Sequence, residues 1–190
     1  MATSPTRPVF LVLVVLVLLG AVGYRSFAST SSAADAGPAG DGELPEGTSV
    51  YDHEHAGVTE LDPHLLRALR RAARAAVDDD VDLVVNSGWR SRSYQQRLLD
   101  EAVATYGSRA EAARWVSTPD SSPHVSGDAV DIGPAPAAAW LGTYGAQYGL
   151  CRIYDNEPWH FELRPEATRG NADRCPSMYA SPTHDPRMHQ

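Results

Sequence analysis

The sequence contains no lysine, so all sixteen of its basic residues are arginines. This absence excludes the serine chemistry of penicillin-binding proteins, which needs a Ser-x-x-Lys pair. Basic residues are also outnumbered, because 24 acidic residues give the chain a formal net charge of −8 at pH 7. Phosphate binding requires a basic surface. We therefore expect no nucleic acid partner.

Long apolar runs are absent except for one near the N-terminus. Pro8 to Tyr24 carries no charge, and Val9 to Leu19 is almost entirely Val and Leu, with Arg7 before the run and Arg25 behind it. This length lies near the lower limit of about 17–25 residues for a spanning helix. The run predicts export, as a retained single-pass anchor, which we favour, or as a signal peptide cleaved near Ser26-Phe27-Ala28. The chain is then extracytoplasmic, membrane-anchored or secreted.

Residues 26–48 are dominated by Ser, Ala, Gly, Asp and Pro, a composition that indicates a flexible tether. The chain thus divides into an N-terminal signal-anchor or signal peptide (1–25), a linker (26–48) and a domain (49–190). The remaining length suits one globular unit. We find no internal repeat and expect a monomer.

Cysteine is also scarce, since the chain has only Cys151 and Cys175. An even number of cysteines in an exported chain favours a disulfide. Closing a loop of this size would contribute on the order of 3 kcal/mol in the chain-entropy model. Two free buried thiols are the alternative.

Helical and strand patterns alternate along the domain. Asp62-Pro63 is a helix start signal, followed by apolar residues at helical spacing until Asp78-Asp79-Asp80. Further helices are expected at 93–105, 109–116 and 135–148, and strands at 81–85, 129–132, 151–154 and 159–163, the last two forming a hairpin. This alternation indicates an α+β fold.

Three short stretches carry the chemistry: residues 87–91 (SGWRS), 122–131 (SPHVSGDAVD) and 157–160 (EPWH). His124, Asp131 and His160 form a common set of three protein ligands for catalytic zinc. His124 and Asp131 are seven residues apart, which would place them on opposite faces of a straight strand. A bend is therefore required, and Gly127 permits one.

Two further residues supply the expected catalytic groups. Glu157 is not a ligand in this interpretation; it takes a proton from the attacking water and passes it to the leaving amine. Pro158 biases Glu157 toward an extended conformation, so that Glu157 and His160 can face one cavity. Arg90 would stabilise the developing oxyanion. Trp159 is expected to point to the other face of its strand and to pack there as an anchor.

These stretches resemble the VanY-type D-alanyl-D-alanine carboxypeptidases and the wider group of zinc D-peptidases, which includes D-Ala-D-Ala dipeptidases and L-alanyl-D-glutamate endopeptidases. The matching signatures are Ser-x-His-x-x-Gly-x-Ala-x-Asp and Glu-x-x-His, with Ser-Gly-Trp-Arg-Ser upstream, and they occur in the family order between about Leu61 and Leu163. The resemblance implies a compact α+β, hedgehog-like fold in which a small antiparallel sheet, packed with helices, carries the zinc site.

Residue by residue, the resemblance implies zinc ligation by His124, Asp131 and His160. It also implies catalysis by Glu157 and transition-state stabilisation by Arg90. Ser122 matches a serine that contacts substrate, and Gln95 matches a position associated with the binding cleft. The expected activity is zinc-dependent removal of a terminal D-alanine from peptidoglycan stem peptides. There are three alternatives: an endopeptidase that cleaves the L-Ala-D-Glu bond, a D-Ala-D-Ala dipeptidase, and a non-catalytic wall-binding module.

Other polar clusters carry less weight. His53-Glu54-His55 lacks the His-Glu-x-x-His spacing of a helical zinc site and is expected to be a solvated entry segment. Asp78-Asp79-Asp80 is expected to be a turn rather than a calcium site. The tail from His184 to His189 shows no accompanying pattern, and we expect it to be disordered.

Overall fold

The computed structural model describes residues 40–168 and 174–189. The apolar N-terminal run, the alternative cleavage site at Ser26-Phe27-Ala28 and residues 26–39 of the expected tether lie outside these residues, so their roles remain predictions. Within the described ranges, no helix combines the length and apolar character needed to cross a membrane.

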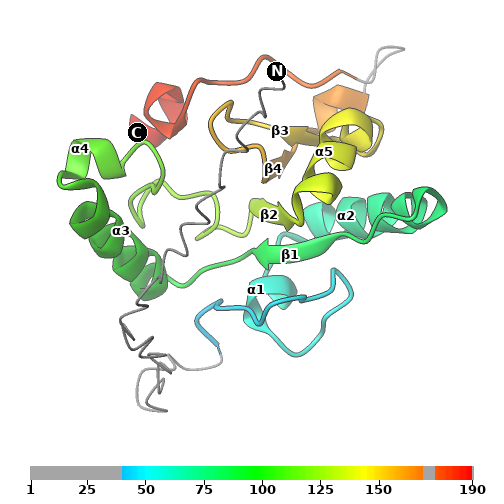
Figure 1. The fold of residues 1–190 in the computed structure, drawn as a ribbon, viewed down its shortest axis with the longest axis horizontal. Coiled ribbons are helices and arrows are strands. Elements are labelled where there is room, and N and C mark those ends of the chain that lie inside the picture. Colours follow the sequence, from blue (N-terminus) through cyan, green and yellow to red (C-terminus); the bar gives the residue numbers. More distant parts are fainter. Residues whose placement is uncertain (1–39, 169–173, 190) are drawn as a thin grey trace, which may run out of the picture.

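A four-stranded antiparallel sheet forms the centre of the fold (Figure 1). Its strands are β1 (Val84–Ser87), β2 (Ala129–Gly133), β3 (Leu150–Arg152) and β4 (His160–Leu163), in the spatial order β1-β2-β4-β3. β3 and β4 form the expected hairpin. The α+β class predicted from the alternation of patterns is confirmed.

In the described part of the chain, five α-helices surround the sheet: α1 (Ala56–Thr59), α2 (Pro63–Ala76), α3 (Arg92–Tyr106), α4 (Arg109–Ala112) and α5 (Ala135–Tyr144). α2 begins where expected, because the Asp62 side chain accepts hydrogen bonds from the backbone N–H groups of His64 and Leu65. α4 is shorter than the expected 109–116. After Ala112 the chain continues in hydrogen-bonded turns that reach Trp115 and Val116.

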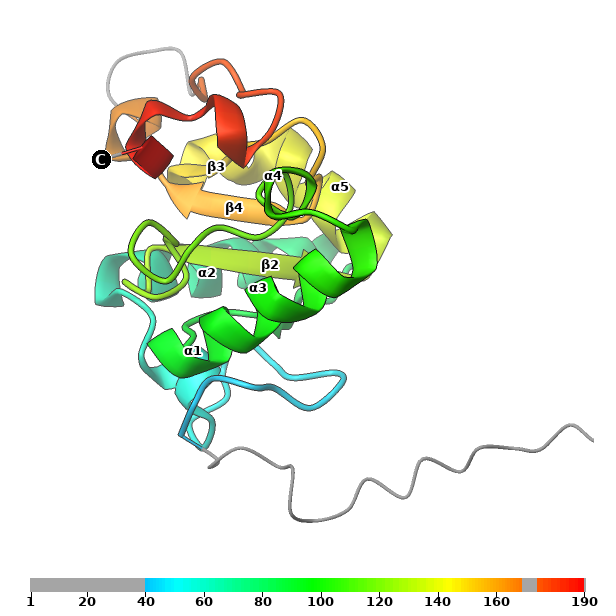
Figure 2. The same ribbon diagram turned by 90° about the vertical axis from the view of Figure 1, so that its left-hand side faces the viewer.

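The two faces of the sheet have different environments. Val130 and Phe161 are paired across β2 and β4 and are buried in the main core, together with apolar residues of α2 and α5. The next pair, Asp131 and His160, points to the opposite face because side chains alternate along a strand. Figure 2 shows α3 in front of the sheet and α2 behind it. The polar face therefore lies on the side of α3.

Residues 40–48, expected as the end of the tether, pack on the domain. The buried Asp41 carboxylate accepts a hydrogen bond from Arg97 at 2.5 Å, and its backbone carbonyl accepts one from Ser91 at 2.8 Å. Leu44 lies against the main core, and the carbonyl of Thr48 accepts from Val85 at 2.9 Å. These contacts place the segment in the folded domain, ahead of the expected boundary at Ser49.

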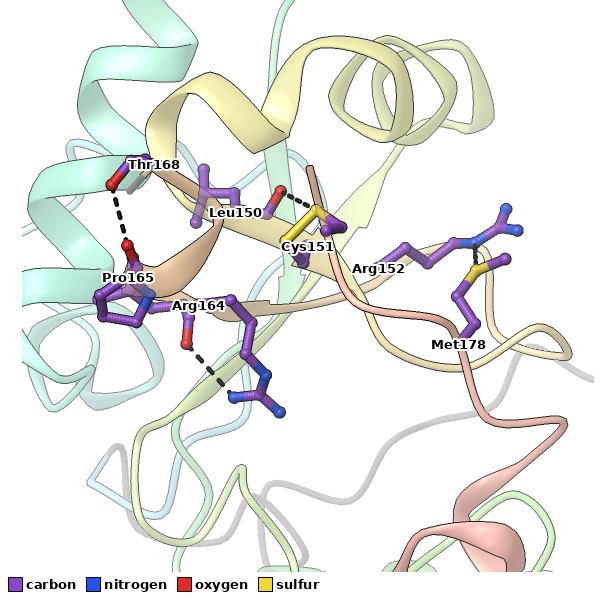
Figure 3. Close-up of a disulfide and its surroundings, with 9 residues drawn as sticks. Leu150, Cys151, Arg152, Arg164, Pro165, Thr168 and Met178 are labelled. Atoms are coloured by element: carbon purple, nitrogen blue, oxygen red, sulfur yellow. Dashed lines mark hydrogen bonds between the residues drawn. A yellow bond between two sulfur atoms is a disulfide. The ribbon is translucent and has the colours of Figure 1, made fainter. Parts of the chain in front are cut away.

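The predicted disulfide is present between Cys151 on β3 and Cys175, 24 residues apart (Figure 3). The bond links the segment that contains Cys175 to β3, which is an edge strand of the sheet. Backbone hydrogen bonds continue this attachment, from Tyr179 to Ile153 and from Asp155 to Tyr179.

The expectation of a disordered tail is wrong. Residues 181–189, which we call the C-terminal segment, contain the short 3-10 helices Pro182–His184 and Pro186–His189. Asp185 is fully buried and bonded to Arg187, which also reaches Glu162 on β4. The ion pair between Arg187 and the buried carboxylate of Glu162 holds this segment against the sheet, and no local sequence pattern predicts that pair.

Candidate metal centre

Three donor atoms converge on the polar face of the sheet. Asp131 and His160 are cross-strand neighbours on β2 and β4, and His124 reaches them from the loop before β2. Nδ1 of His160 lies 3.2 Å from Oδ1 of Asp131 and 3.3 Å from Nε2 of His124, which is 3.5 Å from the same carboxylate oxygen. Among the described residues, this is the cluster of His, Cys, Asp and Glu that could hold a metal ion.

These spacings fit a tetrahedral ion. Ligands placed about 2.0–2.1 Å from zinc at tetrahedral angles lie about 3.3 Å from one another. Two imidazole nitrogens and one carboxylate oxygen are also a donor set that suits zinc. The predicted ligand residues are therefore brought together in a geometry that can hold zinc.

The loop carrying His124 contains the predicted bend. Gly127 has φ +79°, a left-handed conformation that glycine adopts readily, and a Cβ there would lie 2.6 Å from the carbonyl oxygen of Glu60. The Gly127 carbonyl accepts a hydrogen bond from Asp62 at the start of α2. Because of the bend, the side chain of His124 reaches the candidate metal position from the loop, while that of Asp131 reaches it from β2.

Each histidine has its second ring nitrogen engaged by an acceptor. Nδ1 of His124 lies 2.8 Å from the carbonyl oxygen of Gly88, and Nε2 of His160 lies 3.3 Å from Oε1 of Glu162. A ring N–H donated to these oxygens makes the other nitrogen of each ring the one that can bind a metal. Such partners orient metal-binding histidines in general.

The cluster is electrostatically coupled. Burial opposes ionisation of Asp131, but His124, His160 and Arg90 outweigh it and hold its pKa well below the usual value. Burial also opposes charge on His160, yet Asp131 and Glu162 raise its pKa to about 9. Burial and the nearby Arg90 lower the pKa of His124. The site thus contains an ionised carboxylate and an imidazole that holds a proton which a metal must displace.

Glu157 lies beside this cluster, with Oε2 4.0 Å from Nδ1 of His160. Its other oxygen, Oε1, is buried and has no hydrogen-bond partner among the described residues. Burial, reinforced by Asp131, raises the pKa of Glu157 to about 7. A carboxyl group of this kind is suited to exchanging a proton near neutral pH.

Arg90 is held by three acceptors. It donates from Nε to the Ser87 hydroxyl at 2.8 Å, from Nη1 to Gln95 at 3.1 Å and from Nη2 to Asp131 at 3.0 Å. Gln95 is buried, and it donates in turn to the carbonyl oxygen of Ser117 at 2.8 Å. Gln95 therefore positions Arg90, in addition to lining the cleft as expected.

A cavity of about 350 Å³ contains all the predicted site residues (Ser122, Gln95, Arg90, Glu157 and the three candidate ligands) in its lining. Four aromatic side chains also line it: Tyr106, Trp115, Tyr154 and Trp159. Trp159 is 39% exposed, so the expectation that it packs as a buried anchor is wrong. The chain turns at Pro158-Trp159 before β4 begins at His160, which leaves Trp159 at the rim.

Sequence reasoning missed Glu162 and Arg187. Glu162 could have been identified, because it follows His160 by two residues and thus lies on the same face of β4. Arg187 had no such signal.

The two polar clusters set aside in the sequence lie away from the site. The solvated character expected of His53-Glu54-His55 agrees with the exposure of His53 and Glu54. Asp80 has a left-handed backbone conformation, which agrees with the turn expected at Asp78-Asp79-Asp80.

Comparisons with known proteins agree with this geometry. The family model described as VanY, D-alanyl-D-alanine carboxypeptidase, matches residues 58–166. A D-alanyl-D-alanine carboxypeptidase of Enterococcus faecalis is 35% identical over 121 residues, which cover 50% of this chain and 44% of that protein. The chain therefore spans less than half the length of this curated relative.

Solved structures give the same result. The vancomycin resistance D,D-pentapeptidase VanY in complex with Zn(II) matches with a TM-score of 0.53 and 27% identity, over 59% of this chain and 80% of that one. VanYB in complex with D-alanine-D-alanine matches with a TM-score of 0.52 and 30% identity, over 54% and 71%. The LD-carboxypeptidase LdcB, 22% identical over 63% and 66% with a TM-score of 0.52, shares the fold. With its family match covering more than half of its residues, the chain belongs to the VanY family.

Proposed function

We propose that this protein is a zinc-dependent D-alanyl-D-alanine carboxypeptidase that removes the terminal D-alanine from peptidoglycan stem peptides. The observation that carries the proposal is the convergence, in one cavity, of three zinc-type donors with a buried carboxyl oxygen of Glu157 that has no partner among the described residues. The VanY relatives with Zn(II) and with D-alanine-D-alanine support the metal and the substrate class.

His124, Asp131 and His160 would hold the zinc ion. When bound, zinc acts as a Lewis acid that polarises the scissile carbonyl and activates water. The two neutral imidazoles contribute no charge and the carboxylate contributes one negative charge. A Zn²⁺ ion held by this set would therefore keep a net positive charge toward the substrate. The hydrogen bonds to Gly88 and Glu162 keep the two rings oriented for this purpose.

Glu157 moves the proton. Its Oε1 has no partner within the described protein, so it is free to accept a proton from the water that attacks the carbonyl carbon. As the peptide C–N bond breaks, the same carboxyl group gives that proton to the departing D-alanine amine. A pKa of about 7 in the metal-free site makes both transfers accessible near neutral pH.

Arg90 provides a fixed positive charge beside the reacting carbonyl. Its three hydrogen bonds leave further N–H groups of the guanidinium for the substrate, since arginine carries five donors. A preorganised cation of this kind stabilises negative charge that develops in the transition state. Ser122 in the cavity lining supplies a polar contact for the peptide.

The location of the reaction is part of the proposal. An apolar N-terminal run followed by a tether would hold the domain outside the cytoplasm within reach of the cell wall. The disulfide between Cys151 and Cys175 supports an oxidising compartment. Cleavage of L-Ala-D-Glu and release of a D-Ala-D-Ala dipeptide use the same catalytic groups, whereas a wall-binding module has no use for Glu157.

The test is incubation of the zinc-loaded protein with a pentapeptide ending in D-Ala-D-Ala, followed by mass spectrometry. We expect release of a single D-alanine, and the Glu157→Ala variant serves as the inactive control. Release of the dipeptide, or cleavage at L-Ala-D-Glu in intact peptidoglycan, would replace the proposed specificity. Binding without any cleavage would identify a wall-binding module.

A further inference from the structure

Glu162 is the acceptor that faces the back of His160. It is 1% exposed, and its Oε1 lies 3.3 Å from Nε2 of the His160 ring, on the side away from the candidate metal position. A donated Nε2–H at this contact makes Nδ1, which faces Asp131 and His124, the ring nitrogen that can bind a metal once its proton is displaced. Glu162 is thus placed to select the ring tautomer that can bind a metal.

A buried carboxylate requires compensation, and the C-terminal segment supplies most of it. Arg187 donates to both oxygens of Glu162, from Nη1 at 2.7 Å and from Nη2 at 3.2 Å. Arg164 adds a third contact at 2.5 Å. A two-point contact by a planar guanidinium sets the orientation of the carboxylate as well as its charge.

Arg187 is itself anchored. Its Nε lies 3.0 Å from both carboxylate oxygens of Asp185, which is fully buried, and its Nη2 makes a further short contact there. Asp185 also accepts from the hydroxyl of Tyr154 at 3.1 Å, and the Tyr154 ring lies 5.0 Å from the ring of His160. The C-terminal segment therefore supports His160 by two routes, one through Glu162 and one through Tyr154.

The position of this segment in the chain makes the arrangement unexpected. The family match ends at residue 166, and Arg187 lies 25 residues beyond Glu162 in the sequence. Between the two, Cys175 is bonded to Cys151 on β3. Pro182 of the same segment also lines the candidate active-site cavity. A segment that only covered the sheet would not need to pair Arg187 with Glu162, the carboxylate that contacts the candidate ligand His160.

We propose that the C-terminal segment is a working part of the metal site, in which Arg187 orients Glu162 and Glu162 fixes His160 with Nδ1 toward the metal. This inference rests on zinc binding in the proposed function. Arg187 and Glu162 are positioning residues, because they act through His160 and touch neither metal nor substrate.

Zinc affinity, measured by competition with a chromophoric chelator, tests the inference without any turnover. We expect Arg187→Gln to weaken zinc binding by about 10–100-fold, the range typical for loss of such an outer partner. Arg152→Gln is the matched control, because Arg152 also contacts residues after the disulfide, through Met178, but touches no partner of a ligand. It should leave zinc affinity unchanged.

A double-mutant cycle separates positioning from general support. If Arg187 acts through Glu162, then Arg187→Gln should cost much less zinc affinity in a Glu162→Gln background than in the wild type. Equal losses in both backgrounds would overturn the proposal, as would unchanged affinity in folded Arg187→Gln. Arg187→Lys should restore affinity only in part, because an ammonium cannot contact both carboxylates as a planar fork does.

The wild type provides a readout that does not depend on whether the variants fold. Nitrogen-15 NMR of the zinc-loaded protein should show hydrogen on Nε2 of His160 and none on Nδ1. The opposite assignment would overturn the proposal. The two proposals can also be told apart. If the wild type shows this tautomer and zinc affinity depends on Arg187, but the wild type releases no D-alanine, the inference is supported and the proposed function is contradicted.

Discussion

Arg90 donates from Nη2 to Oδ2 of Asp131 at 3.0 Å, which leaves Oδ1 of the same carboxylate facing His124 and His160. One oxygen is thus held by the cation and the other is free for a metal. The contact ties the expected oxyanion stabiliser to an expected ligand. A change at Arg90 should therefore affect both the electrostatics of the reaction and the orientation of Asp131.

We predict that Arg90→Lys lowers kcat by about 10²–10³-fold, the range for loss of a preorganised transition-state donor. Lysine retains the charge but cannot span Ser87, Gln95 and Asp131 at once. Steady-state kinetics with a D-Ala-D-Ala peptide measures the loss. Arg92→Lys is the control, since Arg92 is exposed and pairs with Asp120 away from the ligands. Equal activity of both variants would contradict the role of Arg90.

Glu157→Gln should lower kcat by about 10²–10⁴-fold while zinc content stays at one ion per chain. Glutamine has nearly the same shape but cannot accept and return a proton. Metal analysis by mass spectrometry, run alongside the kinetics, separates the two effects. Loss of zinc in this variant would mean that Glu157 is a ligand.

The same residue should make the stability of the metal-free protein depend on pH. Burial raises the pKa of Glu157 from 4.5 to about 7, so the folded protein binds this proton more tightly than the unfolded chain does. The ionised side chain therefore destabilises the fold, fully above pH 7 and not at all below about pH 4.5. The difference amounts to on the order of 3 kcal/mol, given 1.36 kcal/mol per pKa unit.

Urea unfolding with a chelator present tests this expectation. Glu157→Gln should raise the free energy of unfolding at pH 8 and should have little effect at pH 4. Glu166→Gln, at an exposed position, provides the control at both pH values. A Glu157→Gln variant that is less stable than the wild type at pH 8 would contradict the raised pKa.

Replacing both Cys151 and Cys175 by serine should lower the free energy of unfolding by on the order of 3 kcal/mol. The bond closes a loop between residues 24 apart, and removal of that constraint returns conformational entropy to the unfolded chain. Denaturant titration of the double variant measures the loss. An unchanged unfolding midpoint would show that the backbone hydrogen bonds of Tyr179 with Ile153 and Asp155, just after β3, suffice without the bond.

The candidate ligands and Glu157 could be predicted because each lies in a short contiguous motif. The bend at Gly127 could also be predicted, since the odd spacing between His124 and Asp131 demands it. Trp159 was placed wrongly, because strand alternation was applied to a residue that lies in the turn before β4.

The C-terminal segment could not be predicted. Its structure depends on ion pairs between Arg187 and two buried carboxylates, Glu162 and Asp185, and contacts so distant in sequence leave no periodic pattern. Residues 40–48 were misassigned for a similar reason. A composition rich in Gly, Pro and acidic residues resembles a tether, yet Asp41 has a specific partner in Arg97 on α3.

Anomalous diffraction at the zinc absorption edge, from crystals of the zinc-loaded protein, tests the central claim most directly. We predict one peak about 2.0–2.2 Å from Nε2 of His124, Nδ1 of His160 and Oδ1 of Asp131, with Glu157 outside bonding distance. A peak at another place, the absence of any peak, or Glu157 as a direct ligand would contradict the account.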